Sequence, residues 1–214
     1  KNYSPLFAYG YGLTYKDKDS LGDDLSEEAN LSVQTDAVLK IFDNRPLEPW
    51  QLVIADGRNN QVNVTGSTAS LDTITLRAVD RNVQEDSRRM QWNGTGRGSA
   101  GFFAQSRTDL SSYVEANAAL VFDVKVDEKP TAEVRLGIFC GQDCMAEKSV
   151  TENLQALPQK EWTTLSVALK CLATDRAKMD MILSPFYLLT EGKLDLSLYN
   201  LRIEKNVDAE IKCD

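Results

Sequence analysis

The chain has 214 residues, with 24 Lys and Arg against 32 Asp and Glu, a formal net charge of −8 at pH 7, and no histidine. The acidic balance argues against nucleic acid or an anionic membrane surface as partner, and no apolar run reaches the roughly 18 residues of a membrane span. The absence of histidine excludes Ser-His-Asp and Cys-His nucleophilic catalysis and the imidazole ligands of most catalytic zinc sites.

The N-terminal part of the chain divides into two segments of opposite character. "SPLFAYGYGLTY" (4–15) is rich in aromatic residues and glycine, whereas eight of the fifteen residues in 16–30 are charged. Residues 16–30 are therefore predicted to form a solvated linker, which could extend over about 50 Å. Two carboxylate pairs, Asp23–Asp24 and Glu27–Glu28, belong to this linker and are not assigned a catalytic role.

Beyond residue 37 the periodicity is that of short strands separated by turn residues. Two further segments, 151–158 and 172–179, read as short helical turns. Strands with turns this closely spaced predict an all-β fold, an antiparallel β-sandwich or jelly roll. The predicted strands are 38–43, 51–55, 61–64, 73–79, 88–94, 118–130, 132–140, 162–171, 179–190 and 193–204.

Two of these segments show how their faces are divided. In 118–130, one face carries Leu120, Phe122, Val124 and Val126, and the other carries Val121, Asp123 and Lys125. In 193–204, strict alternation groups Asp195, Ser197 and Tyr199 with Leu201 and Ile203, opposite Leu194, Leu196, Leu198, Asn200 and Arg202. Both faces of this last strand are therefore expected to be partly covered.

The glycine-rich stretch 92–103 superficially resembles a phosphate-binding loop. It lacks the preceding parallel strand, the following helix and the lysine that such a loop needs. A β-hairpin with glycines at positive-φ turn positions is predicted instead. Trp92, which alternates with Met90, and Trp162, which opens a strand pattern, are assigned to the core, while Trp50 lies at a loop edge.

Some of these residues also resemble a known family. "PLFAYGYGLTY" is similar to the motif that ends the catalytic region of glycoside hydrolase family three, with Ala8, Tyr9 and Thr14 as the differences. The stretches 109–144, 161–171 and 184–203 resemble the galactose-binding-like β-sandwich appended to bacterial exo-β-glucanases of that family. The resemblance implies that 1–15 is the tail of a missing α/β sandwich domain, 16–30 a linker, 31–206 the galactose-binding-like sandwich and 207–214 a C-terminal tail.

The same resemblance implies that this chain is not itself an enzyme. The family's nucleophile is an aspartate in a Ser-Asp-Trp-like motif, and no Asp-Trp occurs here, since Trp50, Trp92 and Trp162 follow Pro, Gln and Glu. The general acid of the family would lie upstream of residue 1. The implied location is periplasmic or secreted, and the implied partners are the catalytic domains of the same polypeptide.

The four cysteines are Cys140, Cys144, Cys171 and Cys213. A zinc site would need all four, so in an exported protein a disulfide is preferred. The tight loop of "CGQDC" makes Cys140–Cys144 the first choice, with Cys144–Cys171 as the alternative, and Cys213 is predicted to be free. Sequence alone does not choose among the pairings.

Two roles remain open for the sandwich. Docking on the catalytic domains, which it would support and whose active-site rim it would help to shape, is preferred because no loop gathers aromatic residues. The alternative is binding of β-glucan or an oligosaccharide. Sugar recognition pairs an aromatic face with hydrogen-bonding side chains. No cofactor is expected, and calcium is left open with no ligands assigned. The loop candidates for sugar contact are Trp50, Asp56, Arg58, Asn59, Asn60, Arg97 and Gln105.

Overall fold

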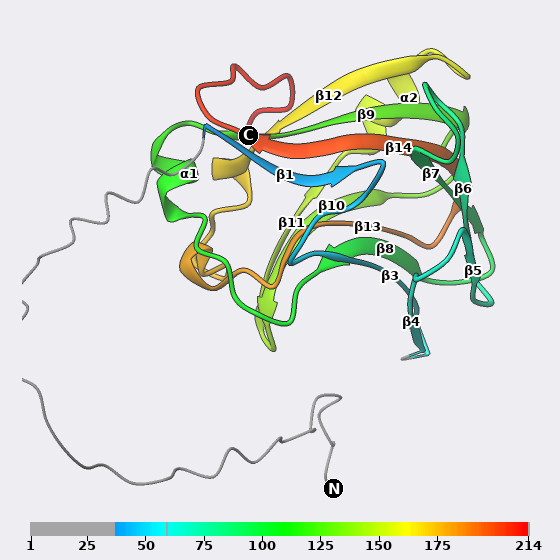
Figure 1. Ribbon diagram of the computed structural model, residues 1–214, viewed down its shortest axis with the longest axis horizontal. Helices are drawn as coiled ribbons and strands as arrows, with labels where there is room; N and C mark the ends of the chain where they lie inside the picture. Colours follow the sequence, from blue (N-terminus) through cyan, green and yellow to red (C-terminus); the bar gives the residue numbers. More distant parts are fainter. Residues whose placement is uncertain (1–36, 59, 214) are drawn as a thin grey trace, which may run out of the picture. The chain divides into compact units, whose positions relative to one another are not determined.

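The computed structural model describes residues 37–58 and 60–213, which form two antiparallel sheets packed face to face (Figure 1). The predicted all-β sandwich is confirmed. The expectations for residues 1–15 and 16–30 lie outside the described residues, as does Asn59. None of the helices in the described ranges is long and apolar enough to cross a membrane.

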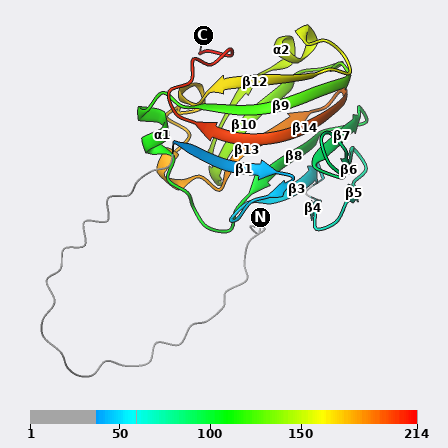
Figure 2. The ribbon, with the colours of Figure 1, turned by 45° about the horizontal axis from the view of Figure 1, so that its top comes forward.

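Sheet A contains eight strands, and its long central strand is β14 (Lys193–Glu204). β9 lies along one side of β14, while β7 and β1 share its other side, each pairing with a different half. Figure 2 shows β12, β9, β14 and β1 side by side in this order. The remaining strands of sheet A are β12 (Trp162–Ala168), β9 (Ala119–Glu128), β7 (Ser87–Asn93), β6 (Ile74–Val79), β5 (Thr68–Ser70), β1 (Val38–Asp43) and β2 (Arg45–Pro46).

Sheet B contains six strands in the order β11-β10-β13-β8-β3-β4. Every neighbouring pair is antiparallel. Their bounds are β11 (Cys144–Ser149), β10 (Val134–Gly141), β13 (Ser184–Thr190), β8 (Gly98–Phe103), β3 (Gln51–Asp56) and β4 (Gln61–Asn63).

Helical structure is confined to the connections. α2 (Thr151–Ala156) confirms the predicted turn, and α1 (Ser111–Glu115) was not predicted. The helical turn predicted over 172–179 is wrong for most of its length, because the 3-10 turns η1 (Leu169–Cys171) and η2 (Met179–Met181) lie at its two ends.

The space between the sheets is filled by apolar side chains from both. Phe42 and Phe122 from sheet A meet Phe102 and Phe186 from sheet B, with ring centroids 5.4 Å apart in Phe42–Phe102 and in Phe122–Phe186. Full burial of each ring contributes roughly 1.5–3 kcal/mol. Trp92 belongs to this core, as predicted, with 3% of its surface exposed.

A β-bulge in β14 explains why strict alternation misassigned its second half. The register between β14 and β9 shifts between Tyr199 and Arg202, where Asn200 has φ of 49°. An extra residue exchanges the two faces of a strand. Leu201 and Ile203 are therefore buried in the same core as Leu194, Leu196 and Leu198 rather than on the face of Asp195.

The predicted hairpin over 92–103 is wrong. β7 pairs within sheet A and β8 pairs within sheet B, so the glycine-rich segment between them crosses from one sheet to the other. Gly94 does have a positive φ of 76°, which a turn residue without a side chain adopts freely.

The structure contains two disulfides. Cys140–Cys144 is the predicted first choice, but Cys213 is not free, because it pairs with Cys171. The pairing Cys144–Cys171 therefore does not form. The last described residues lie beside β12: Ile211 exchanges backbone hydrogen bonds with Ser166 and Ala168, and Ala209 is buried. The Cys171–Cys213 disulfide thus fastens a segment that already pairs with β12, an edge strand of sheet A.

Candidate functional site

Four of the predicted sugar-contact residues lie at one end of sheet B. Asp56, Arg58 and Asn60 belong to the β3–β4 hairpin, and Gly57 N donates to the carbonyl of Arg97 at 2.9 Å, which brings the β7–β8 crossing beside the hairpin. The hairpin is also tied to the loop before β6, since Arg58 Nη1 donates to Asp72 Oδ2 at 2.8 Å.

The carboxylate of Asp56 is fully engaged by its own loop. Its Oδ1 accepts the backbone N–H groups of Arg58 and Asn60, and its Oδ2 accepts the Asn60 side-chain amide at 3.0 Å. The hydrogen bond from the Asn60 side chain is the main cause of a lowered pKa of Asp56, with the two backbone amides adding to it. Asp56 therefore closes a turn rather than offering free oxygens to a sugar.

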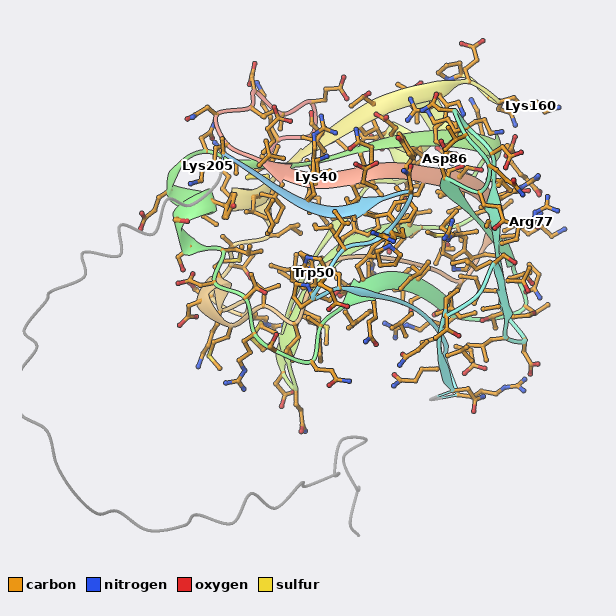
Figure 3. The ribbon with its side chains drawn as sticks, viewed as in Figure 1. Lys40, Trp50, Arg77, Asp86, Lys160 and Lys205 are labelled. Atoms are coloured by element: carbon orange, nitrogen blue, oxygen red, sulfur yellow. A yellow bond between two sulfur atoms is a disulfide. The ribbon has the colours of Figure 1, made fainter. Side chains whose placement is uncertain are left out.

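The other two described candidates do not join this group. Trp50 is 2% exposed and contributes to the core, so its ring faces are not available to a ligand (Figure 3). Trp50 does lie at a loop edge, directly before β3, but its side chain is buried in the core. Gln105 is exposed but follows the opposite end of β8, because Asp56 pairs with Gly98 and Gln51 with Phe103.

The outer face of sheet A carries a denser set of polar and aromatic side chains, which we call the sheet A patch. Its members come from β7, β9, β12, β14 and the loop before β7. They point away from the core because their neighbours along each strand fill it. The patch consists of Arg81, Arg89, Gln91, Asp123, Lys125, Asp127, Trp162, Thr164, Asp195, Ser197 and Tyr199.

Strand pairing brings these side chains into rows across the sheet. Trp162 lies opposite Lys125, Lys125 opposite Ser197, and Ser197 opposite Arg89. The row therefore crosses four strands, a distance of about 14 Å at the usual strand spacing. Gln91, two residues further along β7 than Arg89, lies opposite Asp195 in the next outward-facing row.

Asp195 is the centre of one hydrogen-bonded cluster in the patch. Arg89 Nε donates to Asp195 Oδ1 at 2.7 Å, and Arg89 Nη2 and Gln91 Nε2 donate to Asp195 Oδ2 at 2.5 and 2.8 Å. The hydrogen bonds to Asp195 raise the pKa of Arg89, although burial opposes this. The fork of Arg89 is thus held in a fixed orientation.

Two buried oxygen atoms beside this cluster lack hydrogen-bond partners among the described residues. Ser197 is fully buried, and neither its Oγ nor Asp127 Oδ2 is paired, although Arg89 Nε lies 3.7 Å from the latter. Gln91 and Asp195 of the same cluster also line a cleft of about 400 Å³, together with Thr75. Unpaired buried polar atoms are rare in folded proteins and are commonly satisfied by water or a ligand.

Trp162 lies in the patch and is only half buried, so its assignment to the core is wrong. The guanidinium carbon of Arg81 is 4.5 Å from the centroid of Trp162 and 4.6 Å from that of Tyr199. Arg81 also forms an ion pair with Asp123, whose other oxygen accepts the Thr164 hydroxyl at 2.6 Å. The patch therefore combines two aromatic rings with fixed charged groups.

The outer face of sheet B differs in composition, because it combines a group of aromatic and apolar side chains with the ion pair of Arg135 and Glu147. Phe103 and Phe139 have ring centroids 6.2 Å apart, and Met145, opposite Phe139, is 42% exposed. Tyr187 donates from its hydroxyl to Glu147 Oε1 at 2.9 Å. Burial, followed by this hydrogen bond, raises the pKa of Tyr187.

The structure assigns no metal ligands. Within residues 37–58 and 60–213, no group of three or more Cys, Asp or Glu side chains is placed to hold a metal ion. Asp86, in an acidic loop, is instead occupied by backbone amides, since its carboxylate accepts the N–H groups of Arg81, Asn82 and Val83.

The sequence contained a signal for the sheet A patch. Alternation already placed Asp123 and Lys125 on one face of their strand, and Asp195, Ser197 and Tyr199 on one face of theirs. What it did not contain was the strand order, which puts β9, β14 and β7 next to one another and turns separate polar faces into one surface.

Comparison with known proteins supports this fold assignment. The extra C-terminal domain of an exo-1,3/1,4-β-glucanase from a Pseudoalteromonas species superposes with a TM-score of 0.66 and 18% identity, covering 81% of this chain and 96% of that domain. The whole exo-1,3/1,4-β-glucanase gives a TM-score of 0.69 and 24% identity over 100% of this chain, which spans 26% of that enzyme.

A family 30 carbohydrate-binding module of a Clostridium thermocellum cellulase is similar at a TM-score of 0.56 and 15% identity, over 80% of this chain and 99% of the module. At these identities the likenesses show a common fold. No curated protein matches the chain in sequence. The model of the Exop_C family, described as galactose-binding domain-like, matches residues 48–203. Since this match spans most of its length, the chain belongs to the Exop_C family of galactose-binding domain-like proteins.

Proposed function

We propose that this chain is a non-catalytic module of a β-glucan-degrading enzyme and that it binds glucan through the sheet A patch. Membership of the Exop_C family and the likeness to the extra C-terminal domain of an exo-1,3/1,4-β-glucanase support the first part. The chemistry of the patch supports the second part.

The observation that carries the binding role is the group around Asp195. A glucan presents hydroxyl groups that donate and accept hydrogen bonds, together with apolar C–H faces that pack on aromatic rings. Gln91 and Arg89 are held in place by Asp195, and Trp162 ends the row that contains Arg89. The patch thus offers fixed hydrogen-bonding groups and an aromatic ring on one open surface.

This proposal reverses the preference drawn from the sequence. The sequence favours docking because no loop gathers aromatic residues. Trp50 does not change this, because its ring is buried. The aromatic rings of the patch lie on strands instead: Trp162 on β12 and Tyr199 on β14 of sheet A. Sugar recognition on a sheet face requires no aromatic loop.

The parent enzyme and its location follow as parts of the same proposal. Two disulfides suit a protein that is exported to the periplasm or secreted, because such bonds persist in oxidising compartments. The family three motif in residues 4–15 supports a parent hydrolase of that family, with its catalytic carboxylates in the preceding domains. The chain alone is expected to hydrolyse no glucan.

Calorimetric titration of the chain with laminarin and with mixed-linkage β-glucan tests the binding role. We expect saturable binding that Arg89→Ala weakens by at least about tenfold, corresponding to about 1.4 kcal/mol. Arg135→Ala is the matched control, since Arg135 also pairs with two carboxylates but lies in β10 of sheet B. No heat with either glucan, or equal losses in both variants, would contradict the proposal.

A second candidate function is docking on the catalytic domains of the same polypeptide. An apolar group on the outer face of sheet B, formed by Phe103, Phe139 and the exposed Met145, favours it. In the parent enzyme, Met145→Glu would then lower the stability of the whole enzyme and leave glucan affinity unchanged. Binding and docking use opposite faces and are compatible with each other.

A further inference from the structure

Arg81 lies between two aromatic rings that come from strands two positions apart. Trp162 is on β12, Tyr199 is on β14, and β9 runs between them. Trp162 pairs with Lys125 and Tyr199 with Asp123, so the two residues are offset along the strands as well as separated by two strand spacings of about 9.6 Å. One flat group fits between the rings. The guanidinium of Arg81 fills this space, with its carbon 4.5 and 4.6 Å from the two ring centroids.

The floor of this aromatic slot is also occupied. Asp123 lies on β9, opposite both Thr164 of β12 and Tyr199 of β14. Its carboxylate pairs with Arg81 and accepts the Thr164 hydroxyl. The side chains of Arg81 and Asp123 are 21% and 10% exposed, so the ion pair is largely withdrawn from solvent.

The loop that carries Arg81 is held by its own hydrogen bonds. Asp86, which is 1% exposed, accepts the backbone N–H groups of Arg81, Asn82 and Val83, and Asp80 accepts that of Glu85. Asp86 lies in the loop that joins β6 to β7, where Figure 3 labels it. Asp86 therefore holds the backbone of Arg81, while Asp123 and the two aromatic rings hold its guanidinium.

From this geometry we propose that Arg81 is a positioning residue of the sheet A patch: it holds Trp162 and Tyr199 apart and keeps Trp162 oriented for contact with glucan. The inference rests on the proposed glucan-binding function. A guanidinium on an aromatic face is attracted by the ring, and here one guanidinium restrains two rings at once. A ring that is already ordered loses less entropy when a sugar binds.

Two other roles for Arg81 make different predictions. Removing a guanidinium that contacted the sugar directly would lower glucan affinity without making Trp162 less ordered in the free protein. A guanidinium that merely covered the rings would, when removed, expose them and raise glucan affinity. A positioning residue affects both properties in the same direction: Trp162 becomes less ordered and glucan affinity falls.

The test uses acrylamide quenching of tryptophan fluorescence in the free chain, with Trp162→Phe as the reference that isolates the signal of Trp162. Trp50 and Trp92 are 2% and 3% exposed and contribute little to the quenching. We expect Arg81→Ala to shift Trp162 emission to longer wavelength and to increase its quenching. Arg81→Lys, which keeps the charge beside Asp123, should restore part of the wild-type behaviour. Unchanged emission and quenching in Arg81→Ala would overturn the proposal.

The second readout is calorimetric affinity for a laminari-oligosaccharide. We expect Arg81→Ala to weaken it about tenfold, with Arg81→Lys intermediate. A higher affinity in Arg81→Ala would overturn the proposal in favour of a cover. Absence of binding by the wild-type chain would refute the proposed function, whereas the quenching result would still decide whether Arg81 orders Trp162. If Arg81→Ala does not fold, Arg81→Lys carries the test, with the same directions of change and smaller effects.

Discussion

Arg89 on β7 and Asp195 on β14 form a two-point ion pair, with Nε–Oδ1 and Nη2–Oδ2 distances of 2.7 and 2.5 Å. Their side chains are 25% and 9% exposed. Removing Arg89 would leave a largely buried carboxylate with Gln91 as its remaining hydrogen-bond donor. We expect Arg89→Met to destabilise the chain by about 2 kcal/mol, after allowance for partial exposure.

Urea unfolding of Arg89→Met and of the double variant Arg89→Met/Asp195→Asn measures this effect. The double variant should be the more stable of the two, since it carries no unpaired charge. If the single variant were as stable as the wild type, the ion pair would contribute nothing to folding.

The carboxylate of Asp86 should make stability depend on acid pH. Burial raises its pKa, but hydrogen bonds from the amides of Asn82, Val83 and Arg81 lower it, and the net result lies below the ordinary value of 3.8. A carboxyl whose pKa is lowered on folding contributes stability above its unfolded pKa and loses it as the pH falls through the folded pKa. This contribution should therefore be complete above pH 3.8 and decline below it.

Melting temperatures of the wild type and of Asp86→Asn between about pH 2 and pH 7 test the assignment. The variant should melt lower at neutral pH, by roughly 4–8 °C for a loss of about 2 kcal/mol. The difference should shrink towards the acid end of this range. A constant difference at all pH values would show that the charge of Asp86 is not responsible.

Gly137 and Gly101 flank Tyr187 in one cross-strand row of sheet B. A Cβ at Gly137 would lie 2.3 Å from Tyr187 Cζ, closer than any real contact, so the tyrosine ring requires glycine at this position. We expect Gly137→Ala to cost about 1–3 kcal/mol. Adding Tyr187→Ala removes the clash but also removes the ring. The double variant should recover little of the lost stability if burial of the ring matters, and much of it if the clash alone lowers stability. Thermal unfolding that left Gly137→Ala unaffected would show that the ring moves freely.

The two disulfides should contribute unequally to stability. Cys171–Cys213 spans 42 residues and Cys140–Cys144 only 4. On the chain-entropy model their contributions are about 4 and about 2 kcal/mol. Cys171→Ser/Cys213→Ser should thus lower the melting temperature more than Cys140→Ser/Cys144→Ser. The reverse order would mean that residues 207–213 add little to the sandwich.

Much of the fold could be predicted from local patterns. Each predicted strand segment overlaps a strand, because half-buried strands alternate and their turns carry Gly, Pro, Asn and Asp. The strands β2, β5 and β11 were not predicted, and the errors of arrangement come from contacts distant in sequence. The bulge at Asn200 reverses the faces of β14, and the β7–β8 segment changes sheets where local signals suggested a hairpin.

Prediction of the candidate site required the same missing information, namely which strands are neighbours in the folded chain. The neighbours of Trp50 resemble a loop, yet its ring is buried in the core. Trp162 begins a strand, which favours the core, yet β12 presents it on the outer face beside Lys125. Alternation identifies the two faces of a strand, but which face is buried depends on the neighbouring sheet.

The glucan-binding role of the sheet A patch can be measured most directly through the three tryptophan indole N–H signals in ¹⁵N-resolved NMR. Trp162 lies in the patch, Trp92 lines the neighbouring cleft, and Trp50 is a buried internal control. On titration with a mixed-linkage gluco-oligosaccharide, we expect a saturable shift of the Trp162 signal and none of the Trp50 signal. A Trp162 signal that stays fixed at saturating oligosaccharide would contradict it.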